Sequence, residues 1–484
     1  MKKIIERNKA NSVISTQVKA SVAYTVCSII QKCLSLITVS IFARLLTEEE
    51  YGLSVVYTSV MNLIIIFTSL ELPFGSFSTA MTKFEEHDKY VSSLNGLCTI
   101  LMLGYYGIYL WGHEFWDNLF KLPSALMIIM GAEMLFSTAK AFWLGQNRFE
   151  LKYKNVIFVT IFQTVLTVCL SVFAVLIVKT GKGFAKVIVG SCIEIVIGFV
   201  IYLNSIVKGK TFFEKRYWIY ALKFNIPLIP YYLSQMIFNQ SDRIMIDHLI
   251  GRREAALYGV GYNLSMILMF VLNSINNSYI PWMYTKIKNN EYDENKKLSI
   301  GLILFIGISL LAFIAIGPEL LFIMGGKKYI SANGVITPIA CSMLLLFYSQ
   351  LFTCVMFYYE DKFFLVFGSI IAALINIILN YLYIPKFGFV AAAYTTLISY
   401  FVFCGFNYIG MLYSLKKHGI CFKIYDTKKL LVILFFFFLI AFGLSALYDY
   451  RYVRYLICFA GIVLAYVNKN KILKAVNFYL SIFR

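Results

Sequence analysis

The chain has 484 residues, of which 60% are hydrophobic and only 14% are charged, and its mean hydropathy is +0.74. An average soluble domain carries about 25% charged residues, and a water-soluble protein of this size could not bury so much apolar surface. The same composition excludes a disordered chain, a collagen and a disulfide scaffold. The sequence therefore predicts a helical protein that crosses a membrane many times.

Apolar segments bounded by charged residues, or by Pro and Gly, follow one another along the chain. A spanning helix needs about 20 mostly apolar residues, and these segments are too long and too uniformly apolar for the strands of a membrane barrel. We expect an all-α polytopic membrane protein with about 14 transmembrane helices. The segments fall near 19–42, 52–75, 90–111, 124–145, 155–178, 185–206, 221–246, 256–283, 298–317, 332–357, 363–384, 388–414, 430–448 and 453–467.

The distribution of Lys and Arg predicts the orientation. With the amino terminus inside, inner segments hold 29 of these residues and outer segments hold 13. Because basic residues favour cytoplasmic loops, we expect a multi-pass protein of the cytoplasmic (inner) membrane with both termini in the cytoplasm. The loop 179–186, with Lys179, Lys182 and Lys186, goes against this pattern. The net charge of +19 is dispersed over many loops, so it does not call for a nucleic-acid partner.

The chain resembles itself at an offset of about 205–214 residues. The stretch 44–53 matches 248–260, 146–149 matches 360–363, and 182–184 matches 387–389, in the same order. This repeat predicts two parallel six-helix lobes around a central cavity, which is a transporter architecture. We expect an N-terminal lobe over 1–207, a C-terminal lobe over 208–415, and two extra helices with a cytoplasmic tail over 416–484.

Two local signals predict where helices begin or break. Thr47 and Glu50 form the pattern of a capping box, which opens the helix that follows. Pro227 and Pro230 should bend or break the segment 221–246 near its cytoplasmic end.

Motifs of enzymes are not found in the sequence. It has no nucleophile elbow, no H-E-x-x-H pair and no complete phosphate-binding loop, and its ten cysteines are scattered without metal-ligand spacing. We expect neither enzymatic activity nor a cofactor nor a bound metal.

Charged residues inside the apolar segments are the candidate functional residues, because each costs about 2.5–3.5 kcal/mol at a helix centre. Lys32 lies in the middle of the first segment, where it either lines a cavity or forms a structural ion pair. Glu133 and Lys140 share a face of the fourth segment but lie too far apart to pair, so Glu133 needs a partner such as Lys32 from another helix. Lys140 either lines the cavity or reaches the cytoplasmic surface.

Three more candidates lie in the sixth and seventh segments. Glu194 is central in its segment and is a candidate for coupling to protons, although a hydrogen-bonded structural acid is an equal alternative. Asp242 is a second coupling candidate. Arg243 is either held by Asp242 and Asp247 in a local network or faces the substrate in the outer part of the cavity.

Four stretches carry a resemblance to a known family. FARLLTEEEYGL (42–53), GQNRF (145–149), residues 226–263 from IPLIPYY to GVGYN, and PKFGFVAAAYTTLIS (385–399) resemble the oligosaccharide flippases of the polysaccharide transporter family, which are Wzx-type proteins within the MATE-like superfamily. The resemblance covers about 18–415. It implies two six-helix lobes around a cavity and the movement of undecaprenyl-diphosphate-linked sugar repeat units for O-antigen, capsule or lipopolysaccharide biosynthesis.

Further expectations and alternatives follow from this comparison. The partners are membrane lipid and the lipid-linked oligosaccharide, a polysaccharide polymerase is a candidate protein partner, and a monomer is expected. The alternatives are a MATE-type antiporter for drugs or cations, a flippase for lipid II, and a membrane-embedded glycan polymerase or ligase. Basic residues such as Lys32, Lys140 and Arg243 favour an anionic cargo over a cationic one.

Overall fold

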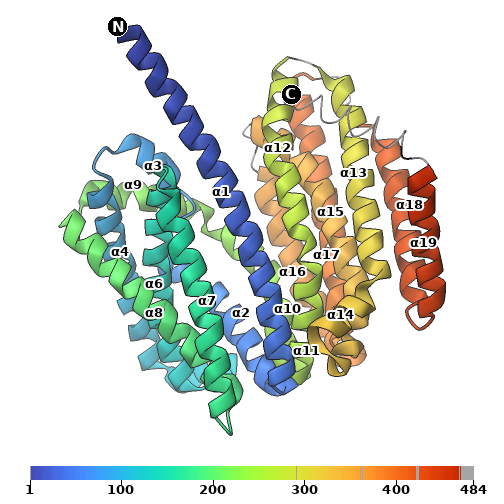
Figure 1. The fold of residues 1–484 in the computed structure, drawn as a ribbon, viewed down its shortest axis with the longest axis horizontal. Coiled ribbons are helices and arrows are strands. Elements are labelled where there is room, and N and C mark those ends of the chain that lie inside the picture. The colour runs from blue at the N-terminus through green and yellow to red at the C-terminus, as the bar shows by residue number, and fades with distance from the viewer. Residues whose placement is uncertain are drawn as a thin grey trace. The chain divides into compact units, whose positions relative to one another are not determined.

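The computed structural model describes residues 2–289, 291–359, 361, 363–420, 424–467 and 469, and every regular element in these ranges is a helix (Figure 1). By contacts the chain forms two compact units, Met1–Ala256 and Leu257–Arg484. The first contains α1 (Lys2–Leu45), α2 (Glu48–Ser69), α3 (Phe77–Lys83), α4 (His87–Trp111), α5 (His113–Phe120), α6 (Ser124–Phe149), α7 (Tyr153–Ile177), α8 (Lys182–Gly209), α9 (Lys215–Asn225), the short 3-10 helix η1 (Ile226–Leu228) and α10 (Ile229–Leu249).

The helix α11 (Arg252–Ser265) begins in the first unit and ends in the second. The second unit continues with α12 (Leu268–Lys288), α13 (Tyr292–Ala315), α14 (Gly317–Gly325), η2 (Lys327–Ala332), α15 (Asn333–Tyr358), α16 (Phe363–Phe387), α17 (Val390–Lys417), α18 (Thr427–Ala446) and α19 (Arg451–Val467).

The described residues contain 11 helices that are long and apolar enough to cross a membrane, or 12 if the bent pair α11 and α12 is counted as one span. Two further expected segments are also helical. The segment 221–246 lies on α9, η1 and α10, and α10 carries many polar residues; the segment 453–467 lies in α19, which has 17 residues. The prediction of an all-α polytopic membrane protein is therefore confirmed.

Both local predictions about helix ends are also confirmed. The Thr47 side chain accepts a hydrogen bond from the backbone N–H of Glu50, and the Glu50 carboxylate accepts one from the backbone N–H of Thr47. The α-helix is interrupted at the prolines, where α9 ends at Asn225, a 3-10 turn follows, and α10 begins at Ile229. Since Pro lacks a backbone donor, this break follows directly from the sequence.

In the first unit, α8 packs against α2, α4, α6 and α7 and is the helix around which the others gather. Three glycines of α8 allow this close packing. A Cβ atom would lie 2.4 Å from the Glu50 carbonyl oxygen at Gly183, 2.5 Å from that of Phe136 at Gly198, and 2.3 Å from that of Asp88 at Gly209. Small residues at such positions let helix backbones approach one another in a membrane.

In the second unit, α15 is buried along almost its whole length and packs against α12, α13, α17 and α18. The C-terminal helix α19 is tied to α14 by a two-pronged ion pair. The guanidinium of the fully buried Arg454 lies 2.8 Å and 3.0 Å from the two carboxylate oxygens of Glu319. This ion pair fixes α19, which with α18 forms the two helices outside the predicted repeat, to the rest of the second unit.

The two compact units divide the chain at residue 256, because α10 packs against α2 and α9 packs against α4. The lobes over 1–207 and 208–415 derive from the internal repeat of the sequence and not from contacts, and they stay a prediction. Most of the tail within the segment 416–484 lies outside the described residues, as does Lys423.

Candidate functional site

A polar cavity of about 250 Å³ opens among the helices of the first unit. Its walls come from α1, α2, α6, α7 and α8. Pockets that bind small molecules usually combine apolar walls with a few converging polar groups, and this cavity has both. Its polar lining consists of Thr38, Ser54, Tyr57, Thr58, Glu133, Thr167, Ser171, Lys186, Ser191 and Glu194.

Glu133 of α6 is held in this cavity by two hydroxyl groups. Its carboxylate accepts hydrogen bonds of 2.7 Å from Tyr57 Oη of α2 and of 2.5 Å from Ser191 Oγ of α8. The two hydroxyls are themselves 3.1 Å apart. In the part of the chain that the structure describes, no ion pair joins Lys32 to Glu133, and neutral donors from α2 and α8 bind this carboxylate instead.

Lys140, Gln163 and Glu194 join α6, α7 and α8. Lys140 Nζ donates to Gln163 Oε1 at 3.0 Å and forms an ion pair with Glu194, whose second carboxylate oxygen accepts from Gln163 Nε2. Less than a fifth of the Lys140 and Glu194 side chains is exposed. Lys140 thus turns toward an acid inside the unit, and both ends of the pair are satisfied locally.

Lys186 is the cavity residue that the sequence analysis missed, since it was counted in a loop. It lies one turn inside α8, where its Nζ donates a 2.8 Å hydrogen bond to Ser54 Oγ of α2. The ammonium also lies 4.8 Å and 4.9 Å from the ring centroids of Phe42 and Tyr51. Among the residues that the structure describes, no carboxylate lies within ion-pair distance of Lys186.

A signal for this position exists in the sequence. Lys186, Gly190 and Glu194 are spaced four residues apart, and such residues share one face of a helix. Lys186 thus lies on the same face of α8 as Glu194, and because α8 begins at Lys182, two of the three lysines counted in the loop 179–186 belong to the helix. The hydroxyl of Ser54 and the rings of Phe42 and Tyr51 belong to α1 and α2, so the residue spacing within α8 could not predict these contacts.

The remaining candidates do not line this cavity. Lys32 lies on α1 inside the span Ala23–Leu45 and its side chain is exposed. Asp242 and Arg243 are buried on α10, where Arg243 Nη1 donates to Gln240 Oε1 at 2.6 Å. Asp247 forms an ion pair with Arg252, at 3.2 Å between Oδ1 and Nε.

The structure therefore places Glu133, Glu194 and Lys186 in the lining of one cavity, and Lys140 lies next to it as the ion-pair partner of Glu194. Lys32, Asp242 and Arg243 belong to other parts of the first unit. The site thus holds one matched ion pair, one carboxylate bound by hydroxyls, and one ammonium bound by a hydroxyl and aromatic rings.

Solved structures of other proteins share this fold. The lipid II flippase MurJ, in an inward closed conformation, matches with a TM-score of 0.64 and 17% identity over 91% of this chain and 100% of that chain. An inward-facing multidrug resistance MATE transporter of the MOP superfamily matches with a TM-score of 0.54 and 14% identity, over 83% and 99%. The fold is thus that of flippases and transporters.

The family follows from the sequence comparison. A family model described as "Polysaccharide biosynthesis protein" matches residues 18–286, which is more than half of the chain, and the chain belongs to this family. A protein of the Lsg locus of Haemophilus influenzae is 24% identical over 326 residues, which cover 64% of this chain and 78% of the relative. The resemblance drawn from the sequence motifs is confirmed.

Proposed function

We propose that the chain is a flippase that moves undecaprenyl-diphosphate-linked oligosaccharide units across the cytoplasmic membrane. These units supply a surface polysaccharide such as an O-antigen, a capsule or an exopolysaccharide. The observation that carries the proposal is membership of the polysaccharide biosynthesis family over 18–286. The fold shared with the lipid II flippase MurJ supports it.

The charges of the first unit fit such a cargo. A diphosphate needs cations that are not already neutralised by acids, and Lys186 is held by a hydroxyl and by rings instead of a carboxylate. Lys32 adds an exposed ammonium in the middle of a spanning helix. Because charge is costly in hydrocarbon, two such cations are best explained by a polar path for an anion.

The Lys140–Glu194 pair and Glu133 are the proposed coupling groups. Their hydrogen bonds join α2, α6, α7 and α8, so a change of charge at one acid would alter the packing of several helices. Asp242 and Arg243 on α10 are proposed as secondary contributors at the helix that follows the proline break. We also propose that both termini lie in the cytoplasm and that the protein acts as a monomer. A polysaccharide polymerase is a candidate protein partner.

A deletion strain tests the proposal. Cells without this chain should lack the surface polymer and accumulate lipid-linked repeat units on the cytoplasmic face of the membrane, while their susceptibility to cationic drugs barely changes. Drug hypersensitivity with an intact surface polymer would contradict the flippase and favour a MATE-type antiporter.

A further inference from the structure

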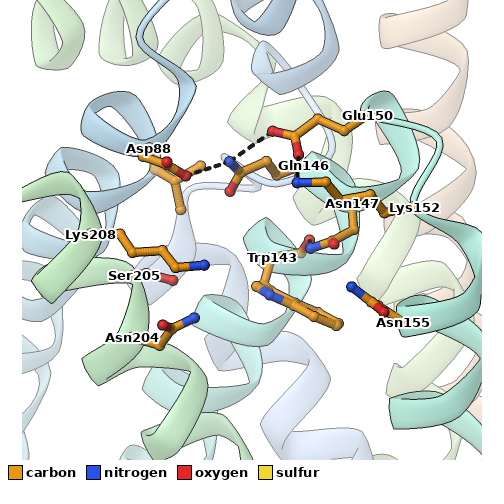
Figure 2. A pocket seen from close by; sticks show the side chains of 11 residues that line it. Asp88, Trp143, Gln146, Asn147, Glu150, Lys152, Asn155, Asn204, Ser205 and Lys208 are labelled. Carbon is orange, nitrogen blue, oxygen red and sulfur yellow. Dashed lines mark hydrogen bonds and ion pairs between the residues drawn. The ribbon is translucent and has the colours of Figure 1, made fainter.

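A second polar pocket, of about 350 Å³, lies within the first unit (Figure 2). It shares the helices α6, α7 and α8 with the cavity around Lys186 but is lined by other parts of them. It is formed where α4 begins, α6 ends, α7 begins and α8 ends. The orientation expected from the Lys and Arg distribution puts these helix ends on the cytoplasmic side. Its lining shares no residue with that of the cavity around Lys186.

One wall of this pocket is already fixed by internal contacts. The buried Gln146 donates from Nε2 to Asp88 Oδ1 at 2.7 Å and to Glu150 Oε1 at 3.0 Å, as Figure 2 shows. Lys152 forms an ion pair of 2.5 Å with Glu150, and this contact raises the pKa of Lys152. Asp88 and Glu150 are therefore already bound by neighbouring side chains, and this wall holds the helix ends in place.

The opposite wall presents side chains that are not engaged. Lys208 and Asn204 project from α8 toward Trp143 of α6, while Asn155 of α7 lies on the other side of the indole (Figure 2). None of these four side chains makes a hydrogen bond or an ion pair with a residue that the structure describes. Ser205, next to Asn204, is buried at the base and donates to the Ile201 carbonyl oxygen.

The chemistry of these groups defines a ligand. Each asparagine amide offers two donors and an acceptor, which suits neighbouring hydroxyl groups, and the ammonium of Lys208 suits a phosphate or a carboxylate. The indole of Trp143 offers a flat apolar face and an N–H donor, which suits the C–H face of a sugar ring. The volume lies at the lower end of the range for small-molecule pockets, about 300–1,000 Å³, so it suits one or two sugar rings.

We propose that this pocket, built from Trp143, Asn155, Asn204 and Lys208, binds a sugar that carries a phosphate or a carboxylate. The inference rests on the proposed function for its biological meaning, because the ligand would then be the sugar diphosphate head group of the cargo, captured at the cytoplasmic face before translocation. Lys154, which lies next to this lining in the sequence, adds positive charge and favours an anionic ligand.

Calorimetric titration of the purified full-length protein in detergent tests the pocket directly. Glucose 1-phosphate should bind with saturation, and glucose and inorganic phosphate should each bind more weakly, because each lacks half of the contacts. Asn155→Ala and Asn204→Ala should weaken binding about 10-fold each. Lys208→Met should remove the preference for glucose 1-phosphate over glucose.

Matched controls separate contact from bulk charge and from misfolding. Lys210→Met removes a charge two residues away but outside the pocket lining, and Asn118→Ala removes an exposed amide on α5. Both should bind like the unchanged protein. If Lys210→Met weakens binding as much as Lys208→Met, or if glucose 1-phosphate does not bind at all, the pocket is not a saccharide site.

Two further measurements separate the pocket from the proposed function. A short-chain polyprenyl-diphosphate sugar that displaces glucose 1-phosphate identifies the ligand as lipid-linked cargo, whereas failure to compete overturns the link to the cargo. If glucose 1-phosphate binds but the protein moves no lipid-linked saccharide, the pocket stands and the flippase proposal fails. If transport occurs and Asn155→Ala and Asn204→Ala leave binding and transport unchanged, the pocket fails and the flippase proposal stands.

Discussion

Lys186 Nζ donates a 2.8 Å hydrogen bond to Ser54 Oγ across the contact between α8 and α2. A hydroxyl orients an ammonium without neutralising it, and the nearby Phe42 and Tyr51 rings add cation–π attraction that also leaves the charge in place. The polar cavity of the first unit therefore holds a cation whose position is fixed while its charge stays available.

Replacing Lys186 tests whether this charge serves transport. Lys186→Met should lower transport of a lipid-linked saccharide about 10- to 100-fold, because a hydrogen bond to a charged group contributes about 1.5–3 kcal/mol. Lys186→Arg should keep part of the activity, since the charge remains. Lys179→Met, in the exposed loop before α8, is the matched control and should transport normally. Transport is measured at equal protein content in the membrane, and an unchanged rate for Lys186→Met would remove this residue from the path of the cargo.

The Lys140–Glu194 pair gives a second prediction, about stability. Lys140→Met or Glu194→Gln alone should destabilise the protein by about 1–2 kcal/mol, because each leaves a poorly exposed charge without its partner. The double variant should regain part of this loss. Thermal unfolding of the detergent-solubilised protein, as a double-mutant cycle, measures the coupling. Strictly additive losses would mean that the two residues act independently.

The Glu319–Arg454 pair predicts how the second unit responds to acid. Burial of Glu319 opposes its ionisation, but the hydrogen bonds from Arg454 outweigh this effect and hold the pKa of the carboxyl below its ordinary value of 4.5. A lowered pKa means that the stabilisation is fully present above about pH 4.5 and is lost as the pH falls further. The melting temperature should therefore drop as the pH falls below about 4.5.

Arg454→Met is the test of that assignment. It should lower the melting temperature at neutral pH and flatten its dependence on pH below about 4.5, because Glu319 then loses the guanidinium that donates two hydrogen bonds to it. A variant whose acid-induced drop matches that of the unchanged protein would show that other carboxyls cause it.

Reporter fusions test the orientation. The charge distribution predicts cytoplasmic signals at three positions and periplasmic signals at three others, and exchanged signals at Lys288 and Gly325 would contradict the order of the spans. The expected cytoplasmic positions are Lys215, Lys288 and Lys423, and the expected periplasmic ones are Gly112, Gly325 and Lys386.

Features that depend on local chemistry could be predicted from the sequence. The capping box at Thr47 and Glu50 and the break at Pro227 and Pro230 each depend on residues within one helical turn. The helical membrane class followed from composition, since long apolar segments have few other ways to satisfy their backbone groups.

The partners within the site could not be predicted, because they come from distant segments. Tyr57 is 76 residues from Glu133 and Ser191 is 58 residues away, and hydroxyl residues of this kind are common in membrane helices. Lys186 was missed for a different reason: it lies where the expected loop 179–186 overlaps the expected segment 185–206, and it was counted with the loop.

Transport in liposomes is the most direct measurement of the central claim. The purified chain is reconstituted into liposomes that carry a polyprenyl-diphosphate-linked oligosaccharide, and a glycosidase added outside reports how much of the inner-leaflet saccharide reaches the outer face. Liposomes with the protein should expose this saccharide much faster than protein-free liposomes do, and Lys186→Met should slow the exposure while Lys179→Met should not. Exposure no faster than in protein-free liposomes, together with uptake of a cationic drug by the same vesicles, would contradict this claim.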